Sequence, residues 1–214
     1  HPFLIDNKTT EATKTTILNN SIVCNAKLKE TTIALNALSL RGKHNCYNAM
    51  AAISVACLLD IESGTIEEAL RSFKSLEHRL EPIKTIDGIT FINDSKATNV
   101  DSVWYALDAM QQPIVWVVGG VDKGNDYGLL QELVKSKVKA IVCLGKDNQR
   151  IHEAFKDSVA MIVDTDKASE AVQKSYQLAE SGDVVLLSPA CASFAERVYC
   201  RFWSAINLET SRLN

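Results

Sequence analysis

The chain has 214 residues and a mass of 23.5 kDa, which fits one large domain or two small ones. Hydrophobic residues make up 46% and charged residues 23%, so extensive disorder is excluded. The net charge is -3 and no run of basic residues occurs, so we expect no nucleic-acid partner. No apolar run approaches the roughly 18 residues that span a bilayer, so we expect no membrane segment either.

The cysteines indicate the cellular compartment of the protein, and the first residues indicate the origin of the chain. The six cysteines form no C-x-x-C pair and show no zinc-site spacing. Several lie in apolar runs, as Cys57 and Cys143 do, which favours buried reduced thiols of a cytoplasmic protein over disulfides. The start, His1-Pro2-Phe3, has no initiator methionine and no signal-peptide pattern, so we expect either a piece of a longer chain or a processed product.

The first part of the chain predicts short strands followed by two helices. Residues 1–40 are rich in Thr, Asn and Lys and contain short β-branched runs. A strong helix follows Gly42, and a second is expected from Ile66 to Leu76, after the start signal Gly64-Thr65. The apolar face of the first helix is expected to comprise Ala49, Ala52, Ile53, Ala56 and Leu59.

A change of pattern near residues 78–82 predicts a domain boundary. Beyond Pro82, two short strands flank the hairpin signal Asp87-Gly88. Strands and helices then alternate, with strands expected at 114–118, 140–144, 160–163 and 183–187 and helices at about 99–110, 126–137, 147–156 and 166–180. This alternation predicts an α/β fold: a Rossmann-like, mostly parallel sheet with helices on both faces.

Three polar clusters follow predicted strands, at residues 93–99, 119–124 and 188–193. Ligands of open parallel sheets bind beyond the carboxyl ends of the strands, so we expect these clusters to meet at one edge. Their lysines, aspartate and hydroxyls suit an anionic substrate. Structural alternatives stay open: Asp94-Ser95 could cap a helix, Gly119-Gly120 could be a tight turn, and Ser188-Pro189 could start a helix.

A fourth cluster, at residues 44–48, opens the first strong helix. Asn45 could cap that helix, or Asn45 and Asn48 could present two carboxamides, about one turn apart, to a purine. The phosphate-loop pattern G-x-x-x-x-G-K-[ST], the G-x-G-x-x-G fingerprint and the G-x-S-x-G elbow are all absent from the 214 residues.

Taken in order, these strings resemble the Mur ligase family, and most closely its members that add D-glutamate. The strings are GKHNCYNA (42–49), HR (78–79), NDSKATN (93–99), GGVDKG (119–124) and LLSPACAS (186–193). The resemblance implies that residues 1–79 are the C-terminal part of a central ATPase domain. It implies that residues 80–214 are the C-terminal Rossmann-like domain.

The resemblance also implies an activity. The family's ATP-dependent reaction would join D-glutamate to UDP-N-acetylmuramoyl-L-alanine through an acyl phosphate, in peptidoglycan biosynthesis in the cytoplasm. ATP and Mg²⁺ would be required, with the phosphate loop and the main Mg²⁺ ligands expected upstream. We therefore expect the 214-residue chain alone to be inactive.

Roles for individual residues follow from the resemblance alone. Asn45, Asn48, Arg79 and Asp94 would bind the nucleotide cofactor, at its adenine, its ribose–phosphate end and its ribose. The substrate-binding residues would be Lys96, Thr98, Lys123, Ser193 and Phe194, with Lys123 also the catalytic residue that pairs with a D-glutamate carboxylate. None of these residues is implied to bind a metal.

After Ser193 the chain departs from the family pattern, and no clean match follows Phe194. Two other functions stay open: an amide ligase of the same superfamily that uses a different amino acid, or a non-catalytic Rossmann-like binding module.

Overall fold

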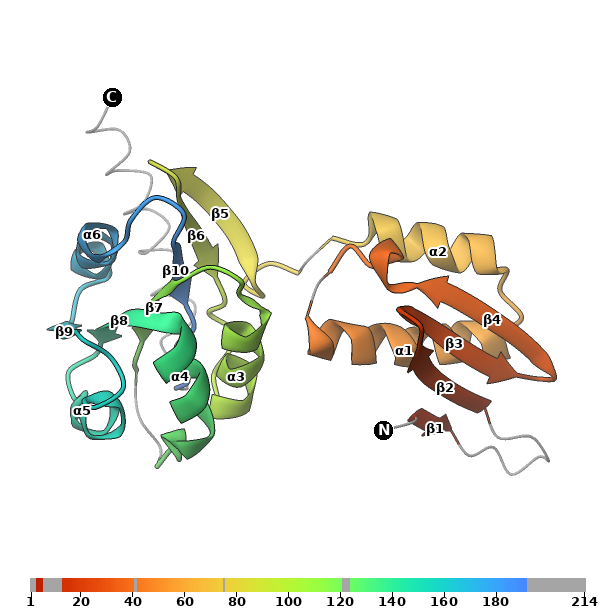
Figure 1. The fold of residues 1–214 in the computed structure, drawn as a ribbon, viewed down its shortest axis with the longest axis horizontal. Coiled ribbons are helices and arrows are strands. Elements are labelled where there is room, and N and C mark those ends of the chain that lie inside the picture. The colour runs from red at the N-terminus through yellow and green to blue at the C-terminus, as the bar shows by residue number, and fades with distance from the viewer. Residues whose placement is uncertain (1–2, 6–12, 41, 75, 121–123, 192–214) are drawn as a thin grey trace. The chain divides into compact units, whose positions relative to one another are not determined.

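A computed structural model describes residues 3–5, 13–40, 42–74, 76–120 and 124–191. The chain divides into two compact units, His1–Ser75 and Leu76–Asn214, drawn in Figure 1. No helix among the described residues combines the length and the apolar character needed to cross a membrane.

The first unit is an antiparallel sheet with two helices, and its strands lie in the part of the chain where the β-branched runs predicted short strands. Its strands pair in sequence order and are β1 (Phe3–Ile5), β2 (Thr13–Leu18), β3 (Ser21–Ala26) and β4 (Lys29–Ala34). A 3₁₀ turn, η1 (Leu35–Ala37), follows β4. Ile22, Cys24 and Ile33 turn inward and pack with apolar residues of the helices. The hydroxyls of Thr15 and Ser54, also buried, hydrogen-bond at 2.6 Å.

Helix α1 (Lys43–Leu58) buries a slightly different stripe from the predicted one. Ala49 and Ile53 are buried as expected, and Ala56 packs partly against the core. Ala52 and Leu59 are exposed, and Met50 is buried instead. Positions 49, 50 and 53 lie on one side of the helix, whereas position 52 lies about 160° around the helix axis from position 50.

Helix α2 (Ser63–Ser72) begins three residues before the expected start and ends four residues before the expected end. Ser39 explains the early end: its backbone N–H donates to the carbonyl of Leu70, and its hydroxyl to that of Phe73. These bonds satisfy carbonyls left open where a helix terminates. Phe73 and Leu76 are exposed, so burial does not favour a longer helix.

The second unit contains a six-stranded sheet of order β5-β6-β10-β7-β8-β9. Its strands are β5 (Glu81–Ile86), β6 (Ile89–Asn93), β7 (Ile114–Val118), β8 (Val138–Leu144), β9 (Ile162–Thr165) and β10 (Val184–Leu187). Only β5 pairs antiparallel, through the hairpin that Asp87-Gly88 predicted. Strand β9 starts two residues later than expected, in register with the end of β8.

Helices cover both faces of this sheet, which confirms the predicted α/β fold (Figure 1). One face packs on α3 (Val100–Ala109), α4 (Gln131–Lys137), which follows the 3₁₀ turn η2 (Tyr127–Leu130), and α5 (Gln149–Phe155). The other packs on α6 (Ala168–Leu178). Successive side chains of β7 point to opposite faces of the sheet: Trp116 faces α5, whereas Val115 and Val117 face α6.

Lys137, the last residue of α4, closes the end of α3. Its Nζ donates to the carbonyl oxygens of Leu107, Asp108 and Met110 at 3.0, 2.8 and 2.9 Å. A helix end leaves such carbonyls without partners, and a cation there also interacts favourably with the helix dipole. The ammonium group therefore joins two helices that lie 20 or more residues apart in the sequence.

We predict that Lys137→Met lowers the free energy of unfolding of the second unit by about 2 kcal/mol, because three carbonyls lose a charged donor. All three tryptophans (Trp104, Trp116 and Trp203) belong to this unit, so denaturant unfolding followed by tryptophan fluorescence measures it. Lys135→Met, at an exposed position of the same helix, is the control and should change stability by less than about 0.5 kcal/mol. Equal losses in the two variants would contradict the prediction.

Candidate functional site

The segments that follow β6, β7 and β10 are hydrogen-bonded to one another at the carboxyl edge of the sheet. The backbone N–H of Asp94 donates to the carbonyl of Leu187 at 2.8 Å, and that of Gly119 donates to Pro189 at 3.1 Å. The N–H of Ala190 donates to Ala97 at 3.0 Å. For their described parts, the expected meeting of the three polar clusters is confirmed.

Asp94 lies at the centre of this edge and is buried. Its Oδ1 accepts from the N–H of Leu80 at 3.1 Å, and its Oδ2 accepts from the Ser188 hydroxyl at 3.0 Å. Burial raises the pKa of this carboxyl to about 6, against the lowering effects of Ser188, Leu80 and the charge of Arg79. Asp94 does not cap the next helix, because Asn99 does so by accepting from the N–H of Ser102.

Asn93 hydrogen-bonds to the segment with which the second unit begins. Its Nδ2 donates to Glu81 Oε2 at 3.1 Å and lies 3.0 Å from His78 Nδ1. Its Oδ1 accepts from the N–H of Ser95 at 3.1 Å. Sequence reasoning assigned no role to His78 and Glu81, although His78 lies in one of the strings that carry the resemblance.

The segment Ser188–Cys191 is not helical. Ala190 has a φ of +62°, which excludes a helix starting at Pro189. The Trp116 indole N–H donates to the carbonyl of Ser188 at 2.9 Å, and Asn125 Nδ2 donates to that of Ala190 at 3.0 Å. The helix-start alternative for Ser188-Pro189 was therefore wrong, and sequence reasoning missed Asn125.

The backbone at Gly119, in the second cluster, requires glycine. Its φ is +132°, and a Cβ there would lie 2.6 Å from the carbonyl oxygen of Leu144. Both the positive φ and the close approach to β8 therefore require glycine. A backbone requirement of this kind is compatible with a binding role for the residues that follow.

The remaining predicted site residues differ in how they are placed. Lys96 and Arg79 are exposed, and Thr98 is half-buried on the loop after β6. In the first unit, Asn45 is half-buried and Asn48 is exposed. Both lie inside α1, whose N-cap is Gly42 and carries no side-chain cap, so the capping alternative for Asn45 was wrong. Lys123, Ser193, Phe194 and the departing tail lie outside the described residues.

The carboxyl ends of β8 and β9 hold a second polar group that sequence reasoning missed. His152 and Asp164 line an open depression there, together with Gly145, Lys146, Asn148, Gln149, Thr165 and Asp166. Asn148 Oδ1 is buried and has no hydrogen-bond partner within the described part of the chain, which costs about 1–3 kcal/mol. Cys143 lies beside His152 and Asp164.

The cysteines follow the reduced-thiol prediction only in part. All five described cysteines are free, and Cys24, Cys143 and Cys191 are buried as expected. Cys46 and Cys57 are half-buried, and Cys57 packs at the margin of the first unit's core. Burial is the main cause that raises the pKa of Cys143 to about 12, with the charge of Asp164 adding to it.

Burial of Asp94 predicts a pH dependence of stability. Between its usual pKa of 3.8 and about 6, the folded carboxyl keeps a proton that the unfolded chain releases. The second unit should therefore lose up to about 3 kcal/mol from this group as the pH rises from about 4 to about 6. Asparagine does not titrate, so Asp94→Asn should remove that loss.

Denaturant unfolding at pH 4, 5, 6 and 7, followed by tryptophan fluorescence, measures the difference between the variant and the unsubstituted protein. Asp157→Asn, at an exposed position, is the matched control and should keep the pH dependence unchanged. The same pH slope in Asp94→Asn and in the unsubstituted protein would contradict the assignment.

Comparison of the sequence with known proteins identifies the family of this chain. Residues 78–191 match the profile of the Mur ligase, glutamate ligase domain. The chain is 50% identical over 193 residues to UDP-N-acetylmuramoylalanine–D-glutamate ligase of Christiangramia forsetii, which is 90% of this chain and 43% of that protein. The enzyme of the same name from Porphyromonas gingivalis is 49% identical over 157 residues, or 73% of this chain and 35% of that protein. The chain thus spans less than half the length of these curated relatives.

Solved structures share the fold at low sequence identity. A pseudomurein peptide ligase type C from Methanothermus fervidus has a TM-score of 0.64 and 20% identity, covering 90% of this chain and 41% of that one. MurF from Acinetobacter baumannii has a TM-score of 0.63 and 18% identity, covering 89% and 44%. On the evidence of the matched domain, the chain belongs to the Mur ligase family.

Proposed function

We propose that this chain is the C-terminal portion of an ATP-dependent ligase that joins D-glutamate to UDP-N-acetylmuramoyl-L-alanine in peptidoglycan biosynthesis. The observation that carries the proposal is 50% identity, across 90% of the chain, to an enzyme named for that reaction. The proposal places the reaction in the cytoplasm, with small-molecule substrates and no nucleic-acid or membrane partner.

The carboxyl edge of the second sheet supports a reaction between anions. A nucleotide, a carboxylate and D-glutamate repel one another, so a ligase needs cations and oriented donors to assemble them. The exposed side chain of Lys96 and the Thr98 hydroxyl lie on the loop after β6. We assign both to the incoming amino acid, together with Lys123, Ser193 and Phe194.

The residues assigned to the nucleotide fit a purine ribonucleotide in their chemistry. Asn45 and Asn48 lie three residues apart on α1, so their carboxamides project from one side of that helix. Arg79 is exposed and suits a phosphate. Asp94 accepts one hydrogen bond at each oxygen, from Leu80 and from Ser188, and each oxygen has a further lone pair that could accept from a sugar hydroxyl. ATP, when bound, supplies the phosphoryl group that activates the substrate carboxylate, and Mg²⁺ would be held chiefly by upstream residues.

The proposal predicts the amino-acid specificity of the full-length enzyme. Phosphate release should require ATP, Mg²⁺ and UDP-N-acetylmuramoyl-L-alanine, and should occur with D-glutamate but not with L-glutamate or a diamino acid. Release with another amino acid would support the alternative amide ligase of the same superfamily. No release with any amino acid would support the binding-module alternative. The 214-residue chain alone should release none, because its sequence contains no phosphate loop.

Substitution of Lys123 tests the proposed D-glutamate site itself. In the full-length enzyme, Lys123→Ala should raise the KM for D-glutamate by about tenfold to a hundredfold, because a charge-assisted hydrogen bond is lost. The KM for ATP should change much less. Lys135→Ala, at an exposed helix position, is the control and should leave both values unchanged. An unchanged KM for D-glutamate in Lys123→Ala would remove this residue from the site.

A further inference from the structure

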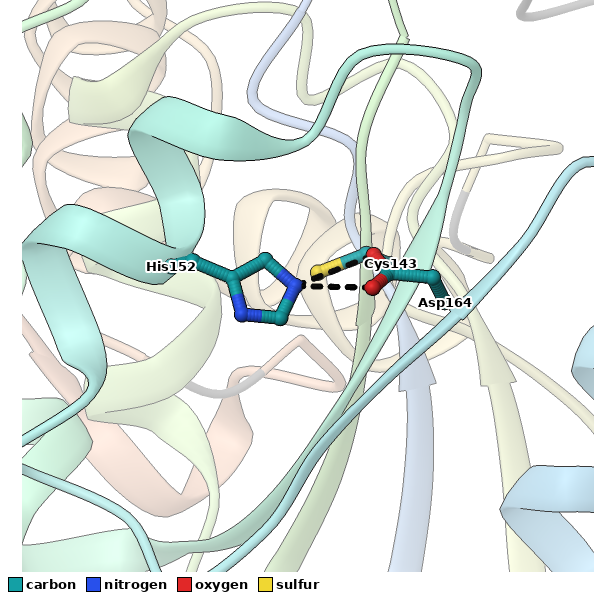
Figure 2. A group of neighbouring side chains, drawn as sticks. All are labelled: Cys143, His152 and Asp164. Atoms are coloured by element: carbon teal, nitrogen blue, oxygen red, sulfur yellow. Dashed lines mark hydrogen bonds and ion pairs between the residues drawn. The ribbon is translucent and has the colours of Figure 1, made fainter.

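A thiol, an imidazole and a carboxylate converge at the carboxyl edge of the second sheet, in a place that the proposed ligase reaction does not use. Cys143 is the penultimate residue of β8, Asp164 lies in the adjacent strand β9, and His152 lies on α5. Figure 2 shows the imidazole facing the Asp164 carboxylate, with the Cys143 sulfur beside them. Within the described residues, this is the one group of three such side chains close enough to share a metal ion.

The distances suit a small metal ion with little movement. The Cys143 Sγ, one imidazole nitrogen and one carboxylate oxygen all lie within 4.8 Å of one another. His152 Nε2 lies 2.9 Å from Asp164 Oδ2. Zinc bonds of about 2.0–2.3 Å place tetrahedral ligand atoms about 3.3–3.6 Å apart, so the sulfur need approach by about 1.5 Å at most. The His152 side chain is 39% exposed and has room to rotate.

A neighbouring side chain already orients the carboxylate. Asn148 Nδ2 donates to Asp164 Oδ1 at 2.8 Å and to the carbonyl of Gly145 at 3.1 Å. In this orientation both carboxylate oxygens face the imidazole, with His152 Nε2 3.1 Å from Oδ1 and 2.9 Å from Oδ2, as Figure 2 shows. Outer hydrogen bonds of this kind hold metal ligands in place, and the Asn148 amide is itself buried.

The donor set identifies the class of metal. Thiolate, imidazole and carboxylate together suit Zn²⁺, whereas Mg²⁺ and Ca²⁺ take oxygen ligands. Cys143 is buried beneath the group, but His152 and Asp164 line the open depression, so a fourth position faces solvent. Three protein ligands with one open position are the arrangement in which zinc keeps a water molecule or takes an anion.

We propose that Cys143, His152 and Asp164 bind one Zn²⁺ ion, with a solvent-accessible fourth position. On binding, the Cys143 thiol releases its proton to water. The imidazole proton moves from Nε2, where the Asp164 carboxylate accepts it, to Nδ1 through solvent, which frees the Nε2 lone pair for the metal. The site is separate from the residues assigned to the ligase reaction, so it would operate as a structural or regulatory site. This proposal departs from the sequence-based expectation of no metal ligand, because the three side chains come from β8, α5 and β9 and no sequence spacing links them.

Titration of the purified chain with Co²⁺, a spectroscopic substitute for Zn²⁺, tests the proposal directly. One equivalent should bind to micromolar protein and produce both tetrahedral ligand-field bands and a thiolate-to-metal charge-transfer band. Zn²⁺ should then displace Co²⁺ and abolish both signals. Zn²⁺ should also raise the unfolding midpoint of the second unit, measured by tryptophan fluorescence, because it binds only the folded state.

Variants identify the ligands. His152→Gln and Asp164→Asn, both at accessible positions, should weaken Zn²⁺ binding at least tenfold while circular dichroism stays unchanged. Cys143→Ala should abolish the charge-transfer band. Asp157→Asn and Glu153→Gln are the matched controls, since both positions are exposed and neither lines the depression. They should bind as the unsubstituted chain does.

Several results would overturn the proposal. One is the absence of stoichiometric binding by the folded chain. Another is a charge-transfer band that persists in Cys143→Ala, because another cysteine would then be the ligand. A third is equal weakening by His152→Gln and Glu153→Gln, which would indicate a general charge effect. Because His152 and Asp164 are accessible, misfolding of Cys143→Ala alone would not obscure the outcome.

Discussion

The position of β10 between β6 and β7 is the constraint on which the second unit depends. This strand is the last of the six in the sequence, yet it pairs in parallel with β6 on one side and β7 on the other. Parallel pairing aligns the carboxyl ends of all three strands, so segments about 25 to 95 residues apart meet at one edge. Every hydrogen bond described among the three polar clusters follows from that placement.

The buried Asp94 carboxylate then ties this edge to the start of the unit. It accepts from Leu80 in the opening segment and from Ser188 after β10. Burying a carboxylate raises its pKa and costs stability at neutral pH, so the arrangement is not one that stability alone would favour. Such a group is common where a protein must hold polar residues ready for a ligand, as the proposed ligase function requires here.

The two candidate sites of the second unit use the same edge of the sheet in different ways. The first joins loops that carry lysine, threonine and backbone N–H groups, which suit anions. The second joins Cys143, His152 and Asp164 at the neighbouring strands β8 and β9, where the donors suit a cation. The edge of one parallel sheet can hold both sites because the loops that follow different pairs of strands place different residues there.

Sequence reasoning succeeded where the pattern is local. The apolar runs of β7 and β10 and the alternation with helices predicted the fold, because a strand buried on both faces needs continuous apolar residues. The errors arose where a distant contact decides a local feature. The end of α2 depends on Ser39, and Asn99 rather than Asp94 caps α3 because Asp94 is held by Leu80 and Ser188.

The sequence by itself determined the α/β class, the three polar clusters and the resemblance to the Mur ligase family, since each depends on residue order and local periodicity. Only the tertiary structure decided that Asp94 is buried, that Lys137 closes α3, and that Cys143, His152 and Asp164 meet. These residues lie 9 to 94 positions from their partners. The spacing of residues along the sequence does not show which of them a crossover connection brings together. The order of the strands in the sheet, together with their parallel pairing, brings these residues within hydrogen-bonding or metal-binding distance.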